Sequence, residues 1–136
     1  MKVTFFVGRI ILGLFFLQAA FNHFSNLSML AGYATSKGVP MPEISVFITG
    51  LLLLFGALSI LLGYKPTLGV IALVIFFIPV TFMMHAFWND ADKMAQMNDM
   101  VSFGKNLAIM GATLMLTAIP TPWPMSLESR KKSKTA

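Results

Sequence analysis

The chain has 136 residues, of which 57% are hydrophobic and only 11% are charged, and its formal net charge is +5 at pH 7. Soluble domains carry a charge at roughly a quarter of their positions, so the composition excludes an ordinary soluble protein. Much of the basic excess lies in the terminal run Arg130–Lys134, which favours contact with membrane lipid head groups and argues against nucleic acid. The chain contains no cysteine, so by itself it cannot build an iron–sulfur cluster or a thiolate metal site.

The apolar runs predict an all-α protein, a four-helix transmembrane bundle in a single domain over residues 1–136. Crossing a hydrocarbon core of about 30 Å requires around 20 mostly apolar residues. The expected spans and the basic tail that follows them are residues 3–24, 43–62, 67–88, 101–119 and 125–136. The polar stretches 25–42 and 89–100 are expected to be loops, because they contain turn residues or a cluster of acids.

Lysine and arginine are distributed unevenly between the two ends of the expected spans. Lys2, Lys65 and the basic tail belong to one side, whereas Lys37 and Lys93 share the other side with most of the acids. By the positive-inside rule, both termini are expected to be cytoplasmic and the two longer loops to face outward. The expected location is a plasma membrane of the bacterial inner-membrane type.

Polar residues on three spans are expected to meet at the outward end. They are Asn22 and His23 on the first span, His85 and Trp88 on the third, and Lys105 and Asn106 on the fourth. A lysine inside a span is costly without a partner. Lys105 is therefore expected to pair with Asp90, Asp92 or Asp99, or to contact a ligand. Pro79 should kink the third span, and the kink either re-aims His85 or only eases packing.

Two further features of the spans carry a functional interpretation. Arg9 interrupts the first apolar run, and its guanidinium either reaches the head groups along its flexible stem or faces the bundle and binds an anionic or quinone-like group. Gly104, Ala108 and Ala112 repeat every four residues, a spacing typical of close packing between membrane helices.

Four motifs make the chain resemble the DoxX family over about residues 3–118. They are Gly8–Leu14 around Arg9, Tyr33–Pro40, His85–Trp88 and Phe103–Ala108. The resemblance implies a four-helix membrane bundle related to the small membrane subunits of an archaeal thiosulfate:quinone oxidoreductase. Other members are linked to oxidoreductase complexes in oxidative-stress defence, and distant eukaryotic relatives look like receptor-assembly factors.

The chain departs from the family pattern in its second span. Many members carry a glutamate in a Gly-x-x-Glu-x-x-Gly setting, and here Leu53 stands between Gly50 and Gly56 at that position. A proton relay or cofactor ligand that uses this carboxylate would therefore be absent from this chain.

Residues and resemblance leave two functions open, and neither establishes whether the chain is catalytic. The first is a membrane subunit of an oxidoreductase system that engages a quinone-like or other amphipathic ligand near the outward interface. Its expected contacts are Arg9, Asn22, His23, His85, Trp88, Lys105 and Asn106. Ligation of a b-type haem or a metal by His23 and His85 is a less favoured variant.

The second function is a non-catalytic scaffold or assembly factor. Its small-residue seam at Gly104, Ala108 and Ala112 would bind a partner membrane protein, and a homo-oligomer is also possible. A third interpretation is purely structural, in which Lys105 pairs with a neighbouring acid and Asn22 and Asn106 only hold the helices together.

Overall fold

The computed structural model describes residues 1–135, and every element in that part of the chain is helical. Four segments are long and apolar enough to cross a membrane: Lys2–Ser25, Pro42–Leu62, Pro66–Asn89 and Lys93–Ala118. The prediction of an all-α protein with four spans is therefore confirmed.

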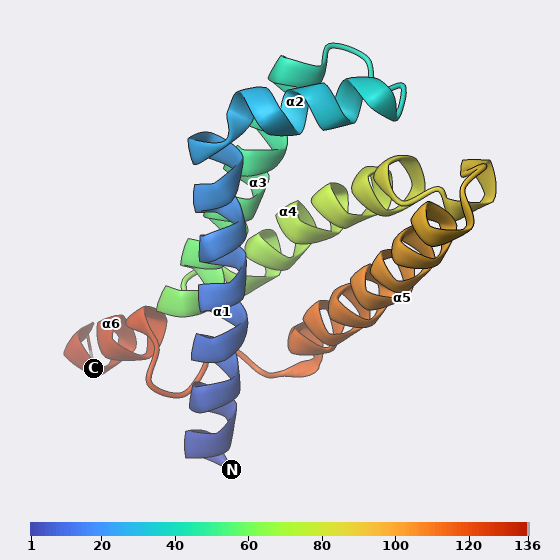
Figure 1. Cartoon of the computed structure of the whole chain (residues 1–136). Coiled ribbons are helices and arrows are strands. Elements are labelled where there is room, and N and C mark those ends of the chain that lie inside the picture. The colour runs from blue at the N-terminus through green and yellow to red at the C-terminus, as the bar shows by residue number, and fades with distance from the viewer. Residues whose placement is uncertain (136) are drawn as a thin grey trace.

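Each long helix packs against the next long helix in the chain. Helix α1 (Lys2–Ser25) lies against α3 (Pro42–Leu62), α3 lies against α4 (Pro66–Pro79), and α4 lies against α5 (Lys93–Met115). Figure 1 shows α4 and α5 as an inclined pair beside the upright α1. Within residues 1–135, α5 packs extensively against only one long helix, α4, and few of its side chains are therefore buried.

The main core lies where α1, α3 and α4 meet. Phe16, Leu53, Leu73 and Phe77 are all buried there, so Leu53 serves as a packing residue in this chain. Close approach of α3 and α4 depends on Gly56, since a Cβ atom at this position would lie 2.4 Å from Leu73 Cγ. Small residues of this kind let membrane helices make extensive van der Waals contact.

The stretch 25–42, expected to be a loop, instead contains helix α2 (Leu27–Ser36). The prediction was wrong because its serines, threonine and glycine were weighted above its apolar spacing. Ala31 and Ala34 recur on one helical face and pack against Val46 of α3. In Figure 1, α2 lies across the end of the molecule opposite to the two chain termini, and this end is called the α2 end below.

The third span changes its helical geometry at Pro79. Proline has no N–H to donate to the carbonyl of Ile75, so the α-helical ladder is interrupted there. The chain continues as a π-helix, η1 (Val80–Met84), before His85 leaves the helix and a short 3₁₀ turn, η2 (Phe87–Asn89), follows. Pro79 was expected to kink this span, and the α-helix indeed ends there and gives way to a π-helix. His85 lies just beyond that π-helix.

The fourth span begins earlier than expected, at Lys93 rather than near Val101. Asp92 caps its first turn, with the carboxylate accepting a hydrogen bond from Ala95 N at 2.9 Å. The acidic stretch 89–100 is therefore mostly helical, and the interpretation of it as a loop was wrong. At its other end, α5 continues into a 3₁₀ turn, η3 (Leu116–Ala118).

The basic tail also forms a helix, α6 (Leu127–Thr135). It is held beside the turn between α3 and α4, where Lys65 N donates a hydrogen bond to Glu128 Oε1 at 2.7 Å. Both termini lie at the same end of the molecule (Figure 1). Which end faces the cytoplasm stays a prediction from the positive-inside rule.

Candidate functional site

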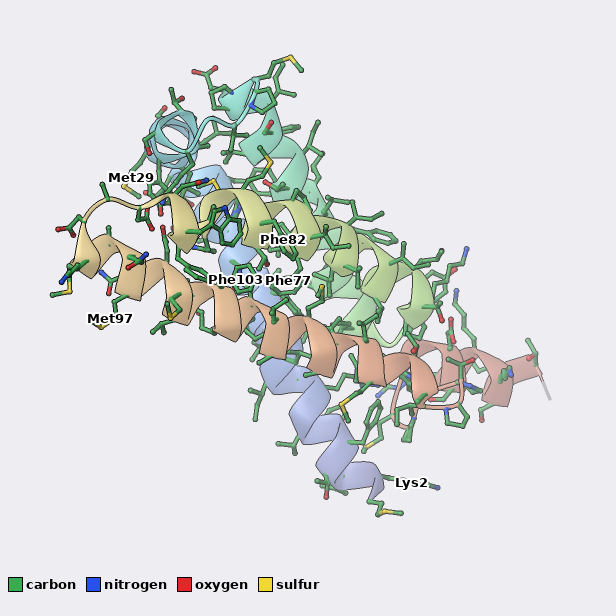
Figure 2. The ribbon with its side chains drawn as sticks, turned by 90° about the vertical axis from the view of Figure 1, so that its right-hand side faces the viewer. Lys2, Met29, Phe77, Phe82, Met97 and Phe103 are labelled. Carbon is green, nitrogen blue, oxygen red and sulfur yellow. The ribbon has the colours of Figure 1, made fainter. Side chains whose placement is uncertain are left out.

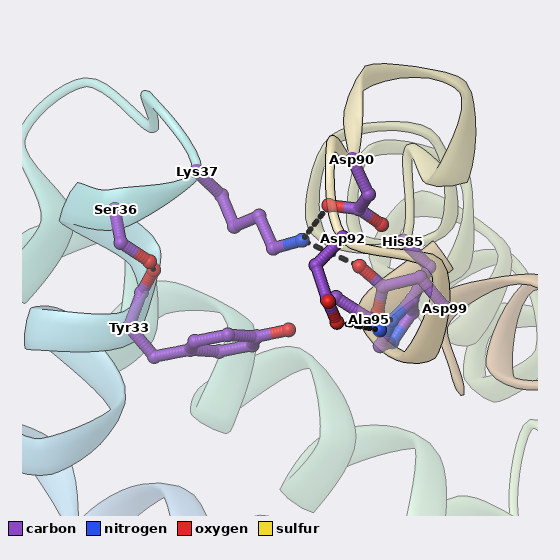
Figure 3. Close-up of polar contacts among 8 residues, drawn as sticks. All are labelled: Tyr33, Ser36, Lys37, His85, Asp90, Asp92, Ala95 and Asp99. Atoms are coloured by element: carbon purple, nitrogen blue, oxygen red, sulfur yellow. Dashed lines mark hydrogen bonds and ion pairs between the residues drawn. The ribbon is translucent and has the colours of Figure 1, made fainter. Parts of the chain in front are cut away.

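An ion-pair cluster joins three elements at the α2 end. Lys37, which follows α2, contacts Asp90 at 3.2 Å and also pairs with Asp99 of α5. On its other carboxylate oxygen, Asp99 accepts a hydrogen bond from His85 Nδ1 at 3.1 Å. Figure 3 shows Lys37 reaching across from α2 to both acids, with the Tyr33 ring on the α2 side of the cluster.

This arrangement shifts the pKa values of Lys37 and Tyr33. The hydrogen bond to Asp99 raises the pKa of Lys37 above its ordinary range, because it favours the charged ammonium. Burial raises the pKa of Tyr33, because it disfavours the phenolate, and the nearby charge of Asp99 adds to the effect. At neutral pH, Lys37 is therefore a cation and Tyr33 a neutral hydroxyl.

The prediction that Lys105 supplies the partner of these acids was wrong. Lys105 is exposed on α5 and makes no ion pair within residues 1–135. Sequence reasoning missed Lys37 as the partner, although the distribution of charges had placed it on the same side as the acids. Spacing along α5 could not reveal this, because the contact comes from another helix.

An apolar groove of about 540 Å³ lies beside the cluster, bounded by α1, α2, α3, α4 and η1. Its polar lining residues are His23, Tyr33, Ser45, Thr49 and His85. Most other lining side chains are hydrophobic, including Val46, Leu52, Ile75, Phe76 and Met83. This combination of an apolar wall and a few polar groups is typical of small-molecule sites.

The groove is open on the flank of the spans. Ile48 of α3 and Ile75 of α4 both line it, and they are 50% and 53% exposed. Both residues lie within membrane-spanning segments. The open flank of the groove therefore faces the depth of the bilayer, which a lipid-soluble molecule can reach.

Of the residues predicted to contact a ligand, His23 and His85 are the ones that line this groove. The His23 ring packs edge-on against Phe76, with ring centroids 5.8 Å apart, and its Nδ1 lies 2.9 Å from Ala19 O. His85 reaches the groove from the segment that follows the π-helix. Of the three spans expected to bring polar residues together, the first and third each place a histidine in this groove, and the fourth contributes none of its lining residues.

The other predicted contacts lie outside the groove. Asn22 is exposed and hydrogen-bonds Asn26, while Asn106 is buried on α5. Trp88 is exposed and packs edge-to-face on Phe103, with ring centroids 5.8 Å apart. Figure 2 shows Phe103 beside Phe82, so these aromatic rings connect the end of the third span to α5.

Arg9 has a structural environment that neither sequence interpretation anticipated. It is only 2% exposed, and it donates hydrogen bonds to Pro124 O at 3.1 Å and Met125 O at 2.8 Å. Its guanidinium also lies 5.2 Å from the ring centroid of Phe6. Arg9 therefore binds the segment that leads into α6, far from the groove.

The described residues hold no group of three or more His, Cys, Asp or Glu side chains that could hold a metal ion. Haem ligation by His23 and His85 stays a sequence-based alternative.

Comparison with known proteins adds a family and one curated relative. The family model for DoxX matches residues 4–86. The inner membrane protein YphA of Escherichia coli (strain K12) is 27% identical over 128 residues, which cover 94% of this chain and 90% of that protein. No solved structure matches. The residues matched by the family model include both histidines of the groove.

Proposed function

Because the chain belongs to the DoxX family of multi-pass plasma-membrane proteins, we propose that its groove holds a lipid-soluble, amphipathic ligand. The proposed ligand is quinone-like, and the proposed role is that of a membrane subunit in an oxidoreductase system. The observation that carries this proposal is the groove itself, which is apolar along its walls, open toward the bilayer and polar where His23 and His85 line it.

The lining residues suit the two halves of such a ligand. A ring fits against Phe76 and Met84, and an apolar tail can leave between Ile48 and Ile75 toward the hydrocarbon of the bilayer. The head group would then contact His85, whose other ring nitrogen is hydrogen-bonded to Asp99. This contact gives a proton on the head group a hydrogen-bonded connection to the ion-pair cluster at the α2 end.

The first test is to purify the protein in mild detergent, record its absorption spectrum and identify extracted molecules by mass spectrometry. An extracted quinone or similar amphiphile that is lost in Thr49→Trp, a variant that fills the groove, is the expected result. Lys105→Gln, which changes an exposed polar residue outside the groove, is the matched control and should retain the molecule.

Other results of this test would change the assignment. A Soret band that disappears in His23→Ala and His85→Ala would replace the quinone-like ligand with haem. Extraction of bulk lipid alone, together with no thermal stabilisation by either the quinone or the hydroquinone form of an added short-chain quinone, would refute the proposal.

A second proposed function, a scaffold for a partner membrane protein, is favoured by one observation on α5. Gly104, Ala108 and Ala112 are exposed, and a Cβ atom at Gly104 would meet nothing within 4 Å. The small-residue seam is thus free of contacts with the rest of the described chain at Gly104. Under this function, Gly104→Leu would disrupt a native membrane complex while ligand binding in the groove stayed intact.

A further inference from the structure

We infer that the groove selects ligands that carry a hydroxyl hydrogen-bond donor, such as a hydroquinone or a phenol, over ligands that offer only carbonyl or ether oxygens. The inference rests on the proposed function, in which an amphipathic molecule occupies the groove. This selectivity arises because most hydrogen-bond donors in the lining already donate to protein acceptors, so that mainly acceptors remain for a ligand.

His23 carries an acceptor on a ring that lines the groove. Its Nδ1 lies 2.9 Å from Ala19 O, and a carbonyl oxygen can only accept a hydrogen bond. The hydrogen of the neutral imidazole is therefore on Nδ1, and Nε2 carries a lone pair. This Nε2 has no hydrogen-bond partner within residues 1–135, and it belongs to a ring that lines the groove.

The position of the hydrogen on the His85 ring is also set by a hydrogen-bond partner, in this case a carboxylate. Its Nδ1 lies 3.1 Å from Asp99 Oδ1, and the same carboxylate pairs with Lys37. An ionised carboxylate is an acceptor only, so Nδ1 of His85 carries the hydrogen, and in the neutral imidazole Nε2 is left as an acceptor. A neutral histidine held by a carboxylate in this way is a good partner for a hydroxyl hydrogen.

The two small hydroxyls of the lining are committed as donors to the backbone. Ser45 Oγ donates to Pro40 O at 2.8 Å, and Thr49 Oγ1 donates to Ser45 O at 2.8 Å. Each hydroxyl has a single hydrogen, so only the oxygen lone pairs of these residues remain for a ligand. Tyr33 is the exception, because its neutral hydroxyl can either donate or accept and does not discriminate between ligands.

The lining therefore offers mainly acceptors to a head group. A ligand hydroxyl satisfies one of these acceptors, whereas a ligand carbonyl or ether placed beside Nε2 leaves two lone pairs facing each other without a hydrogen. Buried polar groups without partners are costly, and sites built to bind a hydroxyl reject analogues that lack it.

The test uses two redox-inert probes with the same apolar chain, 4-nonylphenol and its methyl ether 4-nonylanisole. Binding to the full-length protein in nanodiscs is measured by equilibrium dialysis, with empty nanodiscs subtracted. The phenol is expected to bind about tenfold more tightly than the ether, the scale of one net hydrogen bond. In His23→Phe or His85→Phe, the phenol should lose this advantage, while affinity for the ether stays close to that of the wild type.

Retained ether binding in these variants shows that the groove is still folded, and Lys105→Gln should keep the full preference. Equal binding of both probes to the wild type would overturn the donor selectivity and leave the proposed function standing. Failure of both probes to bind would refute the proposed function along with the inference. A preference for the phenol that persists in both histidine variants would overturn the assignment to His23 and His85.

Discussion

Replacing Arg9 with methionine is expected to release the C-terminal segment while the four spans stay folded. Arg9 is nearly fully buried, and its two hydrogen bonds to Pro124 O and Met125 O join residues that are 115 and 116 positions apart. The main core, around Phe16 and Leu73, contains none of these atoms. The effect should therefore be local.

The magnitude follows from the two charge-assisted hydrogen bonds. Each hydrogen bond to a charged group contributes about 1.5–3 kcal/mol, and methionine recovers part of this because no guanidinium has to be desolvated. We expect a net loss of about 3 kcal/mol in the free energy that holds the segment, which raises its opening constant by roughly two orders of magnitude.

Hydrogen–deuterium exchange of the purified protein measures this opening directly. Uptake over residues 121–131 should accelerate by about a hundredfold in Arg9→Met, with unchanged uptake in α3 and α4. Arg9→Lys should give an intermediate result, because a single ammonium lacks the planar fork that reaches two carbonyls at once. Val7→Met, an exposed position on the same helix, is the control. Wild-type exchange over residues 121–131 in Arg9→Met would refute this reasoning.

Two further predictions concern packing and the ion-pair cluster. Gly56→Ala should lower the melting temperature in detergent, at a cost of about 1–3 kcal/mol, because its Cβ would overlap Leu73. Gly104→Ala should leave the melting temperature unchanged, because open space surrounds that position. Equal effects of the two variants would contradict the assigned α3–α4 contact. The melting temperature should also fall as pH rises above about 10.5, the ordinary value for lysine, because a raised pKa means that the stabilisation by Lys37 is complete below this pH and is lost as the ammonium deprotonates. Tyr33, with its pKa also raised, acts in the same direction, and Lys37→Met should flatten the decline; an unchanged pH profile in this variant would show that the cluster does not stabilise the fold.

The four spans could be predicted because crossing hydrocarbon imposes a length and composition that leave a clear signal in the sequence. Helix α2 was missed because it is short and its signal is weaker, an apolar face of small residues such as Ala31 and Ala34. The early start of α5 was missed because a polar first turn resembles a loop when its capping residue, Asp92, is counted only as an acid.

The candidate site was only partly predictable for a different reason. His23 and His85 could be placed at one level because both lie near the ends of apolar runs. Which lysine meets Asp99 depends on how α2 crosses the bundle, and hydropathy carries no information about that crossing. The partner of Arg9 was equally hidden, since a contact across 115 positions leaves no local pattern.

The contacts of Arg9 also impose an order on biosynthesis. Arg9 enters the membrane with the first helix, whereas its carbonyl partners are 115 and 116 residues further along the chain. At translation rates of about 5–20 residues per second, roughly 6–23 s pass between the synthesis of Arg9 and that of its two carbonyl partners. During this interval its flexible stem can carry the charge to water and lipid head groups. Synthesis of Pro124 and Met125, and not insertion of the first helix, is then the event that withdraws this cation from water, and a nascent chain stopped before Pro124 still displays it.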